Sequence, residues 1–255
     1  MEARFRSTRF GLSDILTEGW KIIQAGAATF LPLGLLYALV NAIVLYISTG
    51  VDYANASDIE TTMLCLQCVV SLVVMVFSLT FTIAQLYLVE GMVQGRPASL
   101  GEALRYAFSR LPAVLLVNIV YAVIVGIGFV LLFIPGVILG IYFTFAIAIV
   151  ALRKIDLPAL QYSLNLVRGQ WWRIFGILLG LGIPIAAISY LINWLAGISA
   201  PYIGFGTIVF YILGSVITFL VGVPTAVLYL NNDYVAPPVQ AAPANPEGDT
   251  TGSSA

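Results

Sequence analysis

Two cysteines three residues apart, Cys65 and Cys68, form the pair in this sequence whose spacing could serve redox or metal chemistry. Residues three apart on a helix share a face, so both sulfurs would point the same way. A metal site needs further ligands, but the chain has no histidine, and the neighbouring residues are Thr, Met and apolar ones. The pair is therefore interpreted as packing residues, and whether it forms a disulfide is left open.

Candidates for acid–base chemistry are equally scarce. Without histidine there is no imidazole base and no pH switch of that kind. No charged residue falls in the middle of a predicted membrane span, where an ion-coupled carrier would place one. Glu90 lies at the end of the second span, and we interpret it as a solvated cap or a partner of Arg96 or Arg105. A catalytic set of Glu90, Asp14 and Glu18 would have to meet in one pocket, and their spacing gives no sign of that. The sequence predicts no enzyme activity, no cofactor and no metal.

The elements that must position any functional side chain are membrane-spanning helices. Of the 255 residues, 60% are hydrophobic and 9% charged, against roughly 45–50% and 25% in a typical soluble protein. Mean hydropathy is +1.01. A span needs about 20 mostly apolar residues. We therefore predict an all-α polytopic membrane protein with six transmembrane helices, at about residues 29–49, 63–89, 114–133, 137–152, 174–198 and 208–230.

The predicted organisation is a basic N-terminal segment (1–10), a membrane domain (11–234) and a tail (235–255). Ile134-Pro135-Gly136 separates the third span from the fourth, and this turn signal predicts a helical hairpin. The tail is rich in Pro, Ala, Gly and Ser and is predicted to be disordered.

The basic residues predict the orientation. All 11 Lys and Arg residues lie before the first span, between the second and third, or between the fourth and fifth. Because Lys and Arg are enriched in cytoplasmic loops, we predict a multi-pass protein of the bacterial cytoplasmic (inner) membrane with both termini in the cytoplasm. The net charge of −1 argues against a nucleic-acid partner.

The three basic segments share an amphipathic pattern, with apolar or small residues at offsets 0, 1, 4, 5 and 8, which mark one face of an α-helix. Each predicted helix precedes a two-span hairpin, giving three units at about residues 11–90, 99–152 and 156–230. Ser99 and Glu102 indicate a capping box in the second unit, and Asp156 is a predicted N-cap in the third. The aligned positions are Ile15, Leu16, Gly19, Trp20 and Ile23, then Ala103, Leu104, Ala107, Phe108 and Leu111, then Ala159, Leu160, Ser163, Leu164 and Val167.

These three helices are predicted to lie on the cytoplasmic side in the membrane interface. One interpretation is that they only anchor the spans, packed on the bundle, and the small residues Gly19, Ala107 and Ser163 favour this packing. The other is that they sense or deform the bilayer. For interfacial anchors we select Trp20, Trp171 and Trp172, and for contacts to anionic headgroups Arg96, Arg105, Arg110, Arg153, Lys154, Arg168 and Arg173.

Polar residues inside the predicted spans are the remaining candidates. They are Asn41, Gln85, Asn118 and Asn193. Hydrogen bonds between spans contribute only about 0.6–2 kcal/mol each, and a role in joining helices is the first interpretation. The alternative is a polar path for a neutral solute or a lipid headgroup.

Several motifs resemble those of a bacterial membrane family. They comprise Ile134-Pro135-Gly136 before a span, then Ala159, Ser163, Arg168-Gly169 and Trp171-Trp172-Arg173, together with residues 95–103. The family includes the six-span membrane domain fused to some glycerophosphodiester phosphodiesterases, and the resemblance covers about residues 11–230, most specifically 95–176. It implies a six-span membrane fold without an agreed activity. The phosphodiesterase chemistry belongs to a separate barrel that needs histidine, which this chain lacks.

The function predicted from the sequence is a non-catalytic integral membrane module that organises lipids or partner proteins at the cytoplasmic face. Its expected partners are the bilayer, through anionic headgroups, and a second copy of the chain or another membrane protein. The alternative is a passive channel or exporter for a small neutral or lipid-like substrate. A cavity lined by the mid-span amides would favour that alternative, and a dry, closely packed bundle would exclude it.

Overall fold

The computed structural model of the chain describes residues 1–49, 60–199 and 204–235, and this part contains ten helices and no strand. Four short helices, α1 (Glu2–Ser7), α2 (Leu12–Ala25), α7 (Ala146–Arg153) and α8 (Ala159–Val167), gather at one end of the molecule. The others are α3 (Ala27–Thr49), α4 (Glu60–Val93), α5 (Leu100–Leu131), α6 (Phe133–Tyr142), α9 (Trp171–Ser199) and α10 (Gly204–Val235). The predicted tail lies outside the described residues apart from its first residue, which ends α10.

Six segments are long and apolar enough to cross a membrane, which identifies a polytopic membrane protein as predicted. They are Ala27–Val44, Cys68–Val93, Leu100–Leu131, Phe133–Arg153, Trp171–Ile192 and Val209–Val235. Prolines at 32, 112, 184 and 224 lie within these helices without ending them. Proline is tolerated in membrane helices because neighbouring groups satisfy the backbone carbonyls that it frees.

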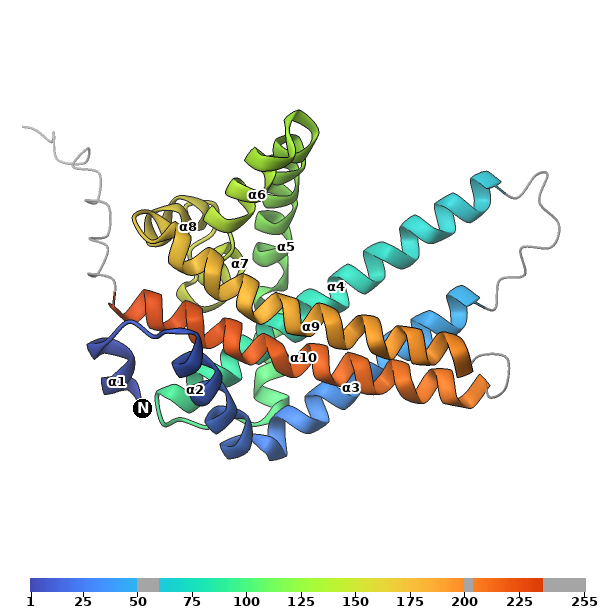
Figure 1. Cartoon of the computed structure of the whole chain (residues 1–255), viewed down its shortest axis with the longest axis horizontal. Coiled ribbons are helices and arrows are strands. Elements are labelled where there is room, and N and C mark those ends of the chain that lie inside the picture. The colour runs from blue at the N-terminus through green and yellow to red at the C-terminus, as the bar shows by residue number, and fades with distance from the viewer. Residues whose placement is uncertain (50–59, 200–203, 236–255) are drawn as a thin grey trace, which may run out of the picture.

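The spans form two diverging arms (Figure 1). Helix α10 packs against both α3 and α9; it lies alongside α9, and α3 crosses it obliquely. The hairpin of α5 and α6 extends away from them, and α4 connects the two arms by packing against both α5 and α3. Large apolar side chains at the tip of the hairpin, including Val130 and Phe133, are more than 70% exposed, as expected for a surface that faces lipid.

The hairpin turn is confirmed, but it lies earlier than the Pro-Gly pair. Leu132 has an extended backbone between α5 and α6, and Pro135 stands in the first turn of α6, where its missing N–H would have no helical partner in any case. Gly136 and Gly128 then allow the two helices to touch, because a Cβ on Gly128 would lie 3.0 Å from the Cα of Gly136.

All six predicted spans are present, but the helices around the third and fourth differ in extent from the predicted segments. The second amphipathic segment and the third span are one continuous helix, α5, which begins with the predicted capping box: Glu102 N–H donates to the Ser99 hydroxyl (3.3 Å) and Ser99 N–H to the Glu102 carboxylate (2.8 Å). The fourth span, Phe133–Arg153, contains a break at residues 143–145 that separates α6 from α7. The predicted N-cap Asp156 was wrong: the N-cap of α8 is Pro158, and Asp156 contributes only its backbone carbonyl, which accepts from Ala159 N–H (2.9 Å).

Most of the core lies at the end where the short helices gather. From Ala146 to Leu152, only Ile147 retains partial exposure, and residues 226–232 of α10 are all buried. A helix that is apolar on all sides, such as α7, is suited to burial. Polar side chains placed among these elements are therefore held in fixed positions.

Candidate functional site: a polar cluster beside an uncharged cavity

The end of α10 carries four consecutive polar or aromatic residues, Asn231 to Tyr234, that together join α10 to the N-terminal segment and to neighbouring helices. The amide oxygen of Asn231 accepts from the backbone N–H of Phe10 (2.8 Å), and its nitrogen donates to the carbonyls of Phe5 (3.1 Å) and Thr8 (2.8 Å). Asn231 is fully buried. One side chain thus satisfies three backbone groups of the N-terminal segment and holds that segment against the bundle.

The next residue, Asn232, positions α9. Its amide oxygen accepts from Arg173 Nη1 (2.9 Å), while Arg173 Nη2 donates to the carbonyl of Phe10 (2.6 Å). Arg173 also donates to Gln170 Oε1 (2.9 Å). The guanidinium therefore joins the start of α9, the end of α10 and the N-terminal segment.

Asp233 belongs to an ion cluster that ties four helices together. Arg153, at the end of α7, donates to Asp233 Oδ2 through Nε (2.9 Å) and Nη2 (2.6 Å), and to Glu90 Oε1 of α4 through Nη1 (2.5 Å). The hydroxyl of Tyr162 on α8 donates to Asp233 Oδ1 (2.7 Å). The Asp233 side chain is only 4% exposed and that of Glu90 13%. Charges this deeply buried require partners.

Burial and the hydrogen bond to the Asp233 carboxylate raise the pKa of the Tyr162 phenol above its ordinary value of 10. Arg96 or Arg105 is the predicted partner of Glu90, but the ion pair that Glu90 makes is with Arg153. Glu18 lies elsewhere, buried beside Arg4 and Lys21.

The carboxylates of Glu90, Asp14 and Glu18 do not meet in one place. Asp14 lies near Arg4 (3.6 Å), so it belongs with Glu18 and not with Glu90. Both carboxylates of the Arg153 cluster are occupied by the guanidinium and the Tyr162 hydroxyl. Within the described ranges, no group of three or more His, Cys, Asp or Glu residues could hold a metal ion. The cluster is suited to fixing helix ends.

The seven basic residues selected from the sequence divide into two groups. Arg110, Arg153 and Arg173 contact protein groups; Arg110 donates to the carbonyl of Val150 (2.9 Å) and lies 3.5 Å from Asp156. The other four, Arg96, Arg105, Lys154 and Arg168, are exposed.

The three tryptophans predicted as interfacial anchors also differ in their exposure. Trp20 is 60% exposed and Trp172 is 77% exposed. Trp171 is partly buried, stacks on Phe175 (centroids 5.1 Å apart) and meets Trp172 edge-on. Trp20 and Trp172 therefore present their indoles to the surroundings of the protein.

The repeated apolar pattern resolves into two rows. The row at offsets 0, 4 and 8 faces the bundle. Its residues at offsets 0 and 4 are buried in all three segments, whereas at offset 8 Val167 is buried and Ile23 and Leu111 are only partly buried. The buried residues at offsets 0 and 4 are Ile15, Gly19, Ala103, Ala107, Ala159 and Ser163. A Cβ on Gly19 would lie 3.2 Å from the Pro224 ring of α10. The row at offsets 1 and 5 faces outward in the first two segments, where Leu16, Trp20 and Phe108 are exposed, Leu104 partly so.

Ser163 also explains the break in the fourth span. Its hydroxyl donates to the carbonyl of Tyr142 (2.8 Å) and accepts from the N–H of Phe145 (3.3 Å). These are backbone groups that a continuous helix would have paired internally. The side chain from α8 thus substitutes for helical hydrogen bonds between α6 and α7.

Of the mid-span amides, Gln85 and Asn118 join helices. Gln85 on α4 is 5% exposed and donates to the carbonyl of Phe219 on α10 (2.6 Å). Asn118 on α5 approaches the Met75 sulfur on α4 (3.7 Å), while Asn41 donates to Tyr37 O within its own helix (2.8 Å). Asn193 lies on α9, and its side chain is outside the described residues.

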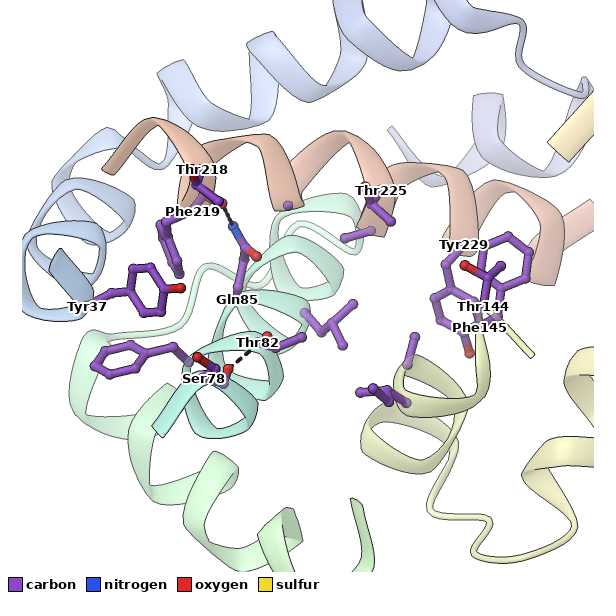
Figure 2. A pocket seen from close by; sticks show the side chains of 16 residues that line it. Tyr37, Ser78, Thr82, Gln85, Thr144, Phe145, Thr218, Phe219, Thr225 and Tyr229 are labelled. Atoms are coloured by element: carbon purple, nitrogen blue, oxygen red, sulfur yellow. Dashed lines mark hydrogen bonds between the residues drawn. The ribbon is translucent and has the colours of Figure 1, made fainter. Parts of the chain in front are cut away.

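A cavity of about 320 Å³ lies between α3, α4, α7 and α10 (Figure 2). Tyr229 on its wall is one helical turn from Asp233, so the cavity adjoins the ion cluster. None of its sixteen described lining residues is charged. Gln85 projects between the helices, and Gly222 makes room for it, because a Cβ at 222 would lie 2.3 Å from Gln85 Oε1. The hydroxyl-bearing lining residues are Tyr37, Ser78, Thr82, Thr144, Thr218, Thr225 and Tyr229.

Cys68 is a free, exposed cysteine, and the side chain of Cys65 lies outside the described residues.

Comparison with known proteins found no matching family model, curated protein or solved structure. The resemblance to the glycerophosphodiester phosphodiesterase membrane family therefore stays a prediction.

The residues that sequence reasoning missed are those at the end of α10. The sixth span was predicted to end at residue 230, directly before Asn231, and α10 continues to Val235. A signal was available: Asn231-Asn232-Asp233-Tyr234 is a run of polar and aromatic residues at the boundary of an apolar span, where side chains have partners on neighbouring helix ends.

Proposed function

We propose that the protein is a non-catalytic integral membrane module whose basic face binds anionic lipid headgroups. The observation that carries this proposal is the division of the basic residues into two groups. Arg110, Arg153 and Arg173 donate hydrogen bonds to protein groups. The other four are exposed, and they are Arg96, Arg105, Lys154 and Arg168. Each Lys or Arg near an anionic surface contributes about 1 kcal/mol to the attraction.

The outward row of apolar side chains supports the same proposal. Trp20 and Phe108 of this row are each 60% exposed, and Trp172 at the start of α9 is 77% exposed. Aromatic rings are favoured at the boundary between headgroups and acyl chains. The charge distribution along the chain supports an orientation with this face and both termini in the cytoplasm, in a bacterial inner membrane. The inward row supports an anchoring role for the helices, because it is packed on the bundle.

The proposal is tested by tryptophan quenching in vesicles that contain brominated phosphatidylglycerol or brominated phosphatidylcholine. The full chain is expected to be quenched more strongly by the anionic lipid, because Trp20 and Trp172 are exposed and the exposed cations would gather anionic headgroups around the protein. The quadruple variant Arg96→Gln, Arg105→Gln, Lys154→Gln, Arg168→Gln should lose this preference. The control Gln161→Ala, Asn165→Ala changes exposed but uncharged side chains of α8 and should keep it. An unchanged preference in the quadruple variant would overturn the proposal.

The cavity favours a second candidate, passage of a small neutral or lipid-like substrate. Gln85 lines it, whereas Asn41 and Asn118 are not among its described lining residues. Flux of an uncharged polyol into proteoliposomes tests this candidate, with Thr225→Leu, which fills the cavity, as the blocked control. Equal flux through both proteins would exclude the cavity as a path.

A further inference from the structure

We infer that the cavity between α3, α4, α7 and α10 is a binding site for an uncharged group that carries several oxygen atoms, such as a polyol or the headgroup of a neutral lipid. The inference is independent of the anionic-lipid surface, so failure of either leaves the other standing.

The first observation is a polar group without a partner. The Tyr229 hydroxyl is buried and makes no hydrogen bond to the described residues, although its residue lines the cavity and is only 1% exposed. Buried hydroxyls in folded proteins nearly always have a partner, and an exception calls for an explanation. A ligand oxygen in the cavity would supply the missing partner.

The second observation is the break in the fourth span. Thr144 and Phe145, in the break, line the cavity, and so do Ile147 and Ala148 in the first turn of α7. The N–H groups of a first turn have no carbonyl partner within the helix. Irregular backbone at membrane depth is tolerated where it is buried in protein or lines a cavity, and interrupted helices form the substrate sites of many transporters. Within the break, Thr144 N–H donates to the carbonyl of Ile141 (3.3 Å) and Phe145 N–H donates to the Ser163 hydroxyl (3.3 Å), so these two donors are paired. The donors that remain for a ligand at this wall are the backbone N–H groups of Ile147 and Ala148 in the first turn of α7.

The lining also defines the charge of the ligand. No Lys, Arg, Asp or Glu is among the described lining residues. A charged group would lose its hydration without gaining a counter-ion. The nearby cation, Arg153, is occupied by Glu90 and Asp233. Hydroxyls and backbone donors suit hydroxyl, ester or carbonyl oxygens, and the volume is at the lower end of the range for small-ligand sites, about 300–1,000 Å³.

The ligand could arrive from the bilayer or from water. Two of the lining residues, Thr82 on α4 and Thr218 on α10, are exposed on the surfaces of membrane-crossing helices. Lining residues that reach the outer surface give the site an opening on the side of the bundle. A ligand from the bilayer and a ligand from water would both present the same uncharged, oxygen-rich group. The test therefore uses probes that distinguish a lipid from a water-soluble molecule.

The test uses the full chain in phosphatidylcholine nanodiscs, with binding measured by native mass spectrometry and by the rise in thermal unfolding midpoint. The probes are dioctanoylglycerol, free glycerol, and dioctanoyl phosphatidic acid, which has the same chains as the first but a charged headgroup. We expect one molecule of dioctanoylglycerol or of glycerol to bind saturably, and phosphatidic acid to be excluded from this site. Binding of the diacylglycerol alone identifies a lipid ligand, and binding of glycerol identifies a free polyol.

Two variants locate the site. Tyr229→Phe removes only the hydroxyl and should weaken binding about five- to tenfold, the effect of one hydrogen bond, without loss of thermal stability. Thr225→Leu fills the cavity and should abolish binding. Tyr121→Phe on α5, outside the lining, is the matched control and should bind as the unaltered chain does. Saturable binding of neither neutral probe, or full binding by both Tyr229→Phe and Thr225→Leu, would overturn the inference.

Discussion

Replacing Arg153 by methionine isolates the energetic role of the ion cluster. The change keeps much of the aliphatic stem but leaves the Glu90 and Asp233 carboxylates without the cation that joins them, with their side chains 13% and 4% exposed. Two unit charges about 4 Å apart attract by about 4 kcal/mol at an effective dielectric constant of 20. Arg153 is itself 25% exposed, so solvent screening lowers its contribution. Breaking a buried pair costs about 3–5 kcal/mol, and we expect a loss of about 3 kcal/mol in the free energy of unfolding.

The measurement is reversible unfolding in mixed micelles of increasing denaturing detergent, followed by tryptophan fluorescence. Arg168→Met, which removes an exposed arginine at the same end of the molecule, is the control and should change the free energy by less than about 0.5 kcal/mol. The triple variant Arg153→Met, Glu90→Gln, Asp233→Asn should be more stable than Arg153→Met alone, because it leaves no unpaired charge. If Arg153→Met unfolds within about 1 kcal/mol of the unaltered chain, or the triple variant is the least stable, the reasoning is refuted.

Three further changes test other contacts. Asn231→Ala should increase hydrogen exchange at residues 5–10 well beyond the control Asn165→Ala, because three backbone groups lose their partner; equal exchange would contradict this. Ser163→Ala should cost about 1–3 kcal/mol of unfolding free energy, since the Phe145 N–H is left without its partner; an unchanged free energy would be the contrary result. The raised pKa of Tyr162 means that its protonated form is favoured by folding, so this stabilisation is complete below about pH 10 and is lost as the pH rises further. Tyr162→Phe should therefore lose less stability above pH 10 than the unaltered chain, and parallel pH profiles would exclude this role.

The parts of the fold that depend on local composition were predictable. Apolar length located six spans, and the sequence at residues 99–102 identified a helix start because both capping contacts are local. The inward row of the repeat was also recognisable, since small residues such as Gly19 and Ala107 indicate close approach between helices.

The parts that depend on distant partners were not predictable. The break between α6 and α7 is stabilised by Ser163, which is 21 residues from the carbonyl of Tyr142, and nothing in the apolar run itself marks it. Similarly, whether an arginine is exposed or paired depends on tertiary neighbours. Arg153 and Lys154 are adjacent in sequence, but Arg153 is held by two carboxylates while Lys154 is exposed with a left-handed backbone (φ 56°).

The contact between Phe10 and Asn231 has a consequence for the synthesis of the protein. The two residues are 221 positions apart. At about 5–20 residues per second, roughly 10–45 s separate their appearance at the ribosome. The N-terminal segment must wait through the insertion of every span before its backbone groups find their partner. Docking of this segment is thus among the last steps of assembly, and protection of residues 5–10 would distinguish completed molecules from unfinished chains.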